Sequence, residues 1–276
     1  METSDSAAKR LLAAYTGGRR DFQGWNLSGA SLSGAQLAGV DLRGANLTSA
    51  NLAGANLIDA NLAGAKLMAT HMCDADLVRV NLKGADARNA TLSRSDLTDA
   101  DLCDADLRGA TLTEARLEGA TLRAARLRDV DLREAYLPGA DLDQADLNGA
   151  NLEGARLFAA RLNDAELQNA DLSWSDLAQV DLTGANLRHA DLAKADLREA
   201  DLKGADLSEA RLTGAHLERA DLRGADLRHA RLRRTDLRGA HLGEVDISAT
   251  GDTTGIRLDR APWMEHAVER DGHTSG

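Results

Sequence analysis

The chain has 276 residues, a formal net charge of −11 at neutral pH, 28% charged residues and only 3% aromatic residues. So few aromatic residues are unusual for a packed α/β enzyme of this length. No apolar run approaches the roughly 18 residues that a membrane span needs, and the opening residues lack the apolar stretch of a signal peptide. We therefore expect a cytoplasmic protein.

The first segment, residues 1–19, is predicted to be a capping helix. Its apolar residues recur at helical spacing and share one face: Ala7, Leu11, Ala14 and Tyr15. Ser4, Asp5 or Ser6 can cap its start, and the Gly17-Gly18 pair ends it. We expect this helix, together with Trp25, to cover one open end of the structure that follows.

From Arg20 to Ala249 the chain repeats one five-residue pattern without a break. A large apolar residue stands at every fifth position from Phe22 to Ile247, and 42 of these 46 positions hold Leu. The exceptions are Phe22, Met72, Ala87 and Ile247. Two residues before each such centre, 35 of 46 positions hold Ala, and the position between them holds Asp or Asn in 29 cases. The unit is therefore Ala-(Asp/Asn)-Leu-x-x, with Gly frequent in the last place.

A period of five excludes the usual elements. On an α-helix the Leu side chains would wander around the axis, because five residues turn the chain by about 500°. On a continuous strand they would alternate between the two faces, because five is odd. The period fits a short extended piece followed by a corner, where Gly accepts a positive φ at no steric cost. Repeated corners would wind the chain into a coil that stacks Leu on Leu, and Ala would keep its core narrow.

Runs such as Ala-Asn-Leu-Ala-Gly, Ala-Asn-Leu-Ile-Asp and Ala-Asp-Leu-Asn-Gly closely resemble the pentapeptide-repeat family, over about five sixths of the chain. The resemblance implies an all-β fold, a right-handed quadrilateral parallel β-helix with 20 residues per coil. Residues 20–249 would then form about 11.5 coils, and the rod would be about 55 Å long.

After residue 249 the pattern decays, and residues 250–276 are predicted to form a C-terminal cap or dimerisation segment. Residues 250–258 look irregular, with a last strand at 256–258. Pro262 suits the first turn of a short helix that would end at Arg270. In the family's antibiotic-resistance members a C-terminal element joins two rods end to end, so the alternative to a cap is a homodimer through residues 259–276.

The sequence offers no convincing catalytic or metal site. Cys73 and Cys103 are one and a half coils apart, so they should lie on opposite faces and form no disulfide. The triplet His71-Met72-Cys73 is the only cluster of metal-ligand types, and the positions one coil away add no strong ligand. We expect no enzyme activity, no cofactor and no bound metal.

The charge is unevenly distributed along the repeats. Residues 20–100 sum to about zero, residues 131–209 (the acidic belt) carry a net −10, and residues 210–240 (the basic collar) carry +4. The belt thus has about −2.5 per coil, against roughly three charges per coil height of B-DNA. Family members that confer quinolone resistance are understood to imitate duplex DNA on gyrase. The alternative is a solvated surface on which Arg offsets Asp, as in Asp196-Leu197-Arg198.

The belt also contains every aromatic residue of the repeats beyond their start: Tyr136, Phe158 and Trp174. With Pro138 and Ala178 they are predicted to form a continuous apolar stripe, which suggests a partner surface. Local packing against neighbouring side chains is the alternative.

Together these features predict a non-enzymatic rod that binds DNA gyrase or topoisomerase IV as a DNA mimic and protects it from a drug or toxin. The runner-up is an interaction scaffold with an unrelated partner, since the resistance proteins often have Phe at the centre and some have interrupting loops. We expect neither nucleic acid nor membrane to be bound. The predicted partner-binding residues are Asp141, Asp143, Asp146, Tyr136, Phe158, Trp174, Asp176, Asp181 and Asp201.

Overall fold

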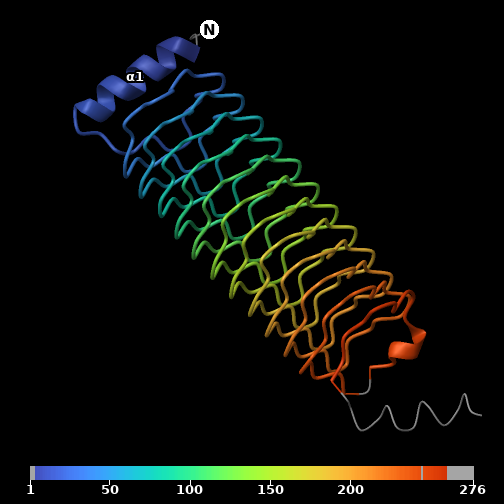
Figure 1. The fold of residues 1–276 in the computed structure, drawn as a ribbon. Coiled ribbons are helices and arrows are strands. Elements are labelled where there is room, and N and C mark those ends of the chain that lie inside the picture. The colour runs from blue at the N-terminus through green and yellow to red at the C-terminus, as the bar shows by residue number, and fades with distance from the viewer. Residues whose placement is uncertain (1–3, 244, 260–276) are drawn as a thin grey trace, which may run out of the picture.

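The computed structural model describes residues 4–243 and 245–259, and it is a straight rod made of one continuous coil (Figure 1). The helix α1 (Ser4–Thr16) lies across one end, and the short 3-10 helix η1 (Ile247–Ala249) lies near the other. Within these described ranges each side of the coil is only one bridge residue long, so no extended strand forms. None of the described helices is long and apolar enough to cross a membrane.

The rod is a solenoid with a 20-residue coil. Parallel bridges join the residue before each Leu to the residue 20 positions later, beginning with Asp21 and Asp41. Leu27 N donates to Asn46 O at 2.7 Å, and Asn46 N donates to Trp25 O at 2.8 Å. Each coil contains four such short pieces, separated by four turns of identical form. The parallel solenoid expected from the period is confirmed.

The corner between two pieces is a tight turn whose third residue has a positive φ. Ala30 N donates to Leu27 O at 3.0 Å and closes one such turn, in which Gly29 has φ 65°. This geometry is that of a type II turn, for which Gly and Asn are favoured. Many turns nevertheless place another residue there, such as Asp59 with φ 56°. The fold therefore imposes the left-handed conformation at every corner, at a cost to residues that carry a Cβ.

The Asp or Asn before each Leu has a local role that its frequency alone did not disclose. Its side-chain oxygen accepts the backbone N–H two residues later, at 3.0 Å both from Ala53 N to Asn51 and from Cys103 N to Asp101. This bond is the Asx turn that short polar side chains form with their own backbone. Because a carboxylate and a carboxamide oxygen accept it equally well, the fold does not require a charge at this position.

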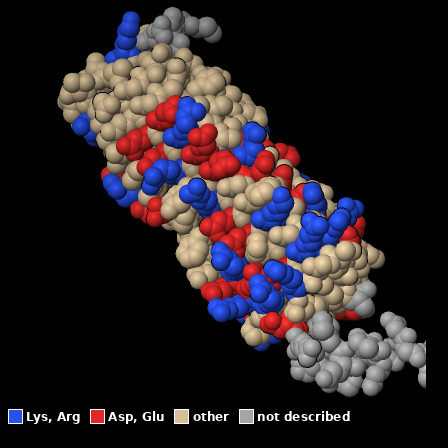
Figure 2. Space-filling view, viewed as in Figure 1, with Lys and Arg blue, Asp and Glu red and all other residues tan. Residues whose placement is uncertain are grey.

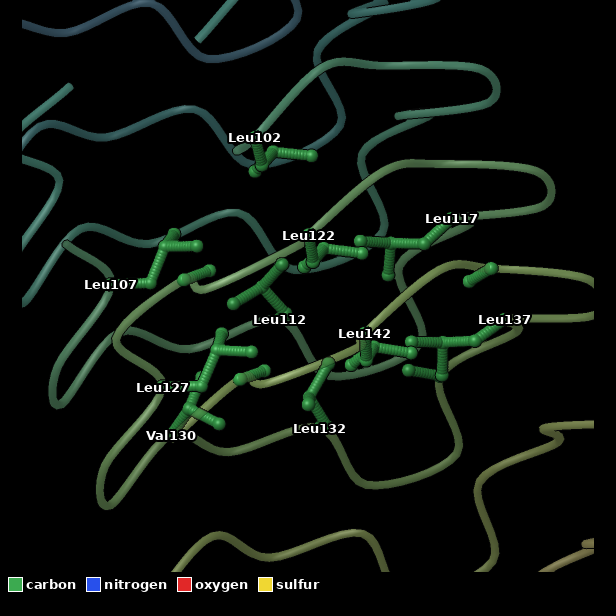
Figure 3. Close-up of a cluster of buried hydrophobic side chains, with 14 of the residues drawn as sticks. Leu102, Leu107, Leu112, Leu117, Leu122, Leu127, Val130, Leu132, Leu137 and Leu142 are labelled. Atoms are coloured by element: carbon green, nitrogen blue, oxygen red, sulfur yellow. The ribbon is translucent and has the colours of Figure 1, made fainter. Parts of the chain in front are cut away.

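The core consists of four stacks of Leu with Ala beside them, and nearly all of these side chains are buried. In Figure 3 the labelled Leu residues point inward from the sides of successive coils. Ala87, the one Ala at a Leu position, is also buried. Where a hydroxyl residue replaces the inward Ala it bonds to the backbone, as Thr70 does by donating to Leu47 O at 2.9 Å. The inward hydroxyl groups at these positions are therefore hydrogen-bonded within the core.

At the N-terminal end α1 extends the same core. Its Ala7, Ala8 and Leu11 are buried in one cluster with the first Leu residues. Trp25 packs edge-on against Phe22, with ring centroids 5.0 Å apart. These contacts place apolar side chains over a coil end that would otherwise be open to water.

Near the C-terminal end the repeat loses its phase by one residue. Leu212 N bonds to a carbonyl 19 residues later, at Arg231, but Leu232 N bonds to Asp252, 20 residues later. The extra residue falls around η1, so Ile247 lies half-buried in a 3-10 helix and does not stack as a Leu equivalent. Coil hydrogen bonding then continues past residue 249 to Arg257. The helix predicted from Pro262 and most of the proposed dimerisation segment lie outside the described residues.

Candidate partner-binding surface

Charged side chains are concentrated away from α1. On the face in Figure 2, the coils next to α1 are almost uncharged, while the coils beyond them are covered by interspersed acidic and basic residues. This distribution follows the sequence, since residues 20–100 sum to about zero and the acidic belt carries −10. A partner can be attracted only by those charges that neighbouring side chains of the rod do not already neutralise.

Much of the charge is neutralised within single repeats. Where Asp precedes a Leu and Arg or Lys follows it, the two side chains pair, as in Arg133–Asp131 at 2.7 Å and Lys203–Asp201 at 2.6 Å. The hydrogen bond from Arg133 holds the pKa of the Asp131 carboxyl below its usual range. Arg198 pairs with Asp196 in the same way. In these repeats the basic side chain neutralises the Asp, as the alternative interpretation of the sequence predicted.

The three acids predicted as the centre of the site are also engaged internally. Asp143 is only 5% exposed, and its carboxylate accepts bonds from Arg161 at 2.6 Å and from both Asn163 nitrogens at 3.0 and 2.9 Å. Arg123 lies 3.2 Å from Asp143 and 3.3 Å from Asp141. Asp146 is paired more loosely, 3.7 Å from Arg128. Asp143 is thus placed as a structural carboxylate, with little surface to offer a partner.

The other predicted acids differ in their surroundings. Asp201 is held by Lys203, whereas Asp176 and Asp181 make no ion pair with a described residue. Asp176 accepts from Ala178 N at 3.2 Å, and Asp181 accepts from Thr183. Burial alone would raise the pKa of Asp181, but bonds from Thr183 and Asn163 and the nearby charge of Arg161 hold it below its usual range, so this charge is partly compensated.

Two further acids were missed by the sequence reasoning. Glu134 and Glu153 are exposed, have no ion-pair partner among the described residues, and line a shallow groove of about 450 Å³ with Arg156, Trp174 and Asp176. Gly154 stands one coil after Glu134, and the gap left by its missing side chain is occupied by the Glu134 carboxylate, whose Oε1 lies 2.6 Å from where a Cβ would be. Reading the sequence in columns of 20 would have shown this gap.

The aromatic residues are exposed but do not form a continuous stripe. Phe158 is 44% and Trp174 60% exposed, while Tyr136 is half-buried. Arg156 and Asp176 occupy the two coils that follow Tyr136 in the same column, so charged groups interrupt the stripe that was expected. Lys194 Nζ lies 3.8 Å from the Trp174 ring centroid, a cation–π contact.

Trp174 occupies an unfavourable backbone position. Its φ is 61°, in the left-handed region where a bulky side chain is an outlier, and the equivalent residue one coil earlier is Gly154. The largest side chain of the belt is therefore held outward at a corner that favours Gly. Strain of this kind is found where surrounding structure or function maintains it.

The basic collar has the opposite character. Arg238 pairs with Asp236 at 2.8 Å, but Arg231, Arg233 and Arg234 are exposed and make no ion pair with any described residue. The reason is in the sequence: Arg231 stands where most repeats have Asp or Asn, so Arg233 has no Asp two residues before it.

Metal and thiol chemistry find no support in the described part of the chain. No three His, Cys, Asp or Glu side chains there are placed to hold a metal ion. His71 Nδ1 lies 3.1 Å from the Thr91 hydroxyl, and Cys73 and Cys103 are separate, half-buried thiols. Burial raises the pKa of the Cys103 thiol, which makes it a poorer nucleophile.

Comparison with known proteins gives one consistent family. The sequence matches the family described as pentapeptide repeats, in segments that together span most of residues 26–243. It is 31% identical to HetL, a pentapeptide repeat protein involved in heterocyst differentiation regulation in the cyanobacterium Nostoc. That match covers 90% of this chain and 93% of HetL, with a TM-score of 0.36. The matching family describes a repeat and indicates no catalytic activity.

Two other solved structures also match the chain. One is QnrB1, a plasmid-mediated fluoroquinolone resistance protein, with 22% identity over 72% of this chain and 97% of that chain and a TM-score of 0.45. The other, from the thylakoid lumen of Arabidopsis thaliana, is 28% identical over 40% of this chain and 66% of that chain, with a TM-score of 0.28. A comparison with curated proteins gave no match.

Proposed function

Because the chain belongs to the pentapeptide-repeat family, we propose that it is a non-enzymatic, cytoplasmic rod that binds a protein through its acidic belt. In its concrete form, the belt stands in for duplex DNA on DNA gyrase or topoisomerase IV and protects that enzyme from a drug or toxin.

The observation that carries the proposal is the uncompensated charge of the belt. Its paired acids are neutralised locally, but a further set makes no ion pair with a described residue: Glu134, Glu153, Asp164, Glu166, Asp171, Asp176, Asp181 and Asp206. The unpaired bases Arg156 and Lys194 offset two of these eight charges, so over four coils about 1.5 negative charges per coil remain, against roughly three for the same length of B-DNA. A DNA-binding surface rich in Lys and Arg would therefore meet a field of the same sign and about half the strength.

The exposed aromatic residues supply a second requirement of a stable complex. Exposed charges at the rim of an interface mainly set the association rate, whereas buried aromatic anchors hold the complex together. Trp174 lines the groove beside its unpaired acids, and Phe158 belongs to the repeat that contributes Arg156 to the groove. These two are the large apolar side chains most exposed in the described chain. In this proposal the acids attract the partner and speed its association, and the two aromatic rings slow its dissociation.

Gyrase supercoiling in the presence of a quinolone tests the proposal. The protein should restore supercoiling, and a variant with Glu134→Gln, Glu153→Gln and Asp176→Asn should do so less well. A control with Asp41→Asn, Asp86→Asn and Asp106→Asn changes the net charge equally, but outside the belt, and should behave like the natural protein.

If neither protein affects supercoiling at low salt, the gyrase proposal fails. Cross-linking from position 158 would then identify the partner of a scaffold with another role, the runner-up function.

A further inference from the structure

One face of the rod carries unpaired charges of both signs at separate heights. This face, here called the Leu192 face, is built on Leu152, Leu172, Leu192, Leu212 and Leu232. Its unpaired acids Glu153 and Asp171 lie in the belt, and its unpaired bases Arg231 and Arg233 lie in the collar. The face thus has an acidic region and a basic region, separated along the rod axis.

The part between the two regions is neutral and flat. Asp191 and Arg211 neutralise each other at 2.9 Å. The outward positions after Leu on these coils hold small side chains, of which Ala193 is buried and Ser173 and Thr213 are half-buried. No long side chain after Leu would hold a second surface away from this strip.

We propose that two copies of the chain associate side by side and antiparallel through the Leu192 face, with Arg233 of one copy opposite Glu153 of the other. A two-fold axis that lies in the interface, perpendicular to the rod and level with the coil of Ala193, gives this arrangement. Bridges place Arg231 two coils after Asp191 and Asn151 two coils before it, about 10 Å on either side. The rotation keeps each column opposite itself, so Arg233, two residues after Arg231, lies opposite Glu153, two residues after Asn151.

Charge complementarity favours the antiparallel orientation, and it favours a second copy of the chain as the binding partner. A parallel pair would place belt on belt and collar on collar, where like charges repel. A nucleic acid would meet the three unpaired Arg residues but also the neighbouring belt of −10. A second copy supplies an acidic region at the matching distance, and a two-fold axis closes the pair without forming a fibre. The inference does not depend on the gyrase proposal.

Sedimentation velocity of the full chain at low and high salt is the first test. We expect a weak dimer at low salt that dissociates as salt is added, because its ion pairs are exposed. X-ray scattering should give a maximum dimension about 1.5 times that of the monomer, since the axis lies nearer the C-terminal end and the rods overlap only in part. A dimension about twice that of the monomer would indicate an end-to-end dimer and overturn the proposal, as would a monomer at low salt.

Charge exchange gives the sharper test. Arg233→Glu and Glu153→Arg should each weaken dimerisation at least about 10-fold, since each replaces two attractions with two repulsions. The double variant should regain it. Arg223→Glu, on the opposite face, is the matched control and should leave the dimer intact. If the double variant is not rescued, or if Arg233→Glu instead abolishes binding of a labelled DNA duplex by a monomeric chain, the inference is wrong.

Discussion

The coils before residue 82 and those after it share one backbone but differ in their surface chemistry. In the first group Asn dominates the position before Leu, and amide side chains bond to each other along the rod, as Asn46 Nδ2 does to Asn26 Oδ1 at 3.1 Å. In the second group Asp dominates and pairs with Arg or Lys. The turn bonds from Ala53 N to Asn51 and from Cys103 N to Asp101 have the same length. The comparison teaches that the fold needs the side-chain oxygen, while the charge is an addition to it.

The largest change in stability should come from substitutions in the core, and it should be the same in the coils before and after residue 82. Leu47 and Leu187 are both fully buried on the same side of the rod, one in each group. Replacing either by Ala should destabilise the protein by about 2–5 kcal/mol, the usual cost of a buried cavity. Urea unfolding of the two variants should give similar losses. A loss confined to one variant would mean that the surface chemistry also governs core stability.

Acid should separate the two groups. In the second group Arg133 lowers the pKa of Asp131, and Arg223, with Lys203, lowers that of Asp221. The described acids of the first group with pKa values lowered in this way are fewer: Asp41, Asp59 and Asp74. A folded pKa below the unfolded value gives a stabilisation that is present above about pH 4 and is lost as the pH falls through the folded pKa. Trp25 reports on the first group and Trp174 on the second. In single-tryptophan variants, melting followed through Trp174 should shift downward between pH 6 and pH 3 more than melting followed through Trp25, and equal shifts would contradict the account.

A smaller gain is expected at the strained corner of the belt. Trp174→Gly should stabilise the fold by about 1 kcal/mol, because Gly accepts the positive φ that Trp does not. The same change should weaken partner binding through a faster dissociation rate. Ala124→Gly, at an equivalent corner with φ 53°, is the control and should stabilise without affecting binding. Denaturation midpoints and surface plasmon resonance would measure both effects.

The smallest expected change in stability tests whether the fold needs the charge of Asp as well as its side-chain oxygen. Asp101 accepts Cys103 N and has no ion-pair partner among the described residues. Asp101→Asn should change the unfolding free energy by less than about 0.5 kcal/mol, whereas Asp101→Ala should cost about 1 kcal/mol through the lost turn bond. If Asn were as costly as Ala, the carboxylate charge itself would be needed for the fold.

The sequence predicted the backbone well, because the five-residue period acts on it directly. Leu, Ala and Gly recur at the positions that the coil buries or turns, so the solenoid and its corners follow from the pattern. The one-residue shift around Ile247 could not be predicted in this way, since the repeat pattern fades there and a register depends on hydrogen bonds between coils.

The candidate surface was less predictable for a different reason. Whether an acid is available depends on its neighbours one coil away, as Arg123 and Arg161 show for Asp143, and Gly154 for Glu134. Counting charge along the chain located the belt, but it did not distinguish the paired Asp143 from the unpaired Glu153.

Displacement of DNA from gyrase tests the central claim most directly, since a mimic must compete for the same surface. Anisotropy of a labelled duplex bound to gyrase should fall as the protein is added at low salt, and this competition should weaken steeply with salt. The variant with Glu134→Gln, Glu153→Gln and Asp176→Asn should compete less well and with a flatter salt dependence. Unchanged anisotropy at low salt, or equal competition by the natural and variant proteins, would contradict the claim that the belt stands in for DNA.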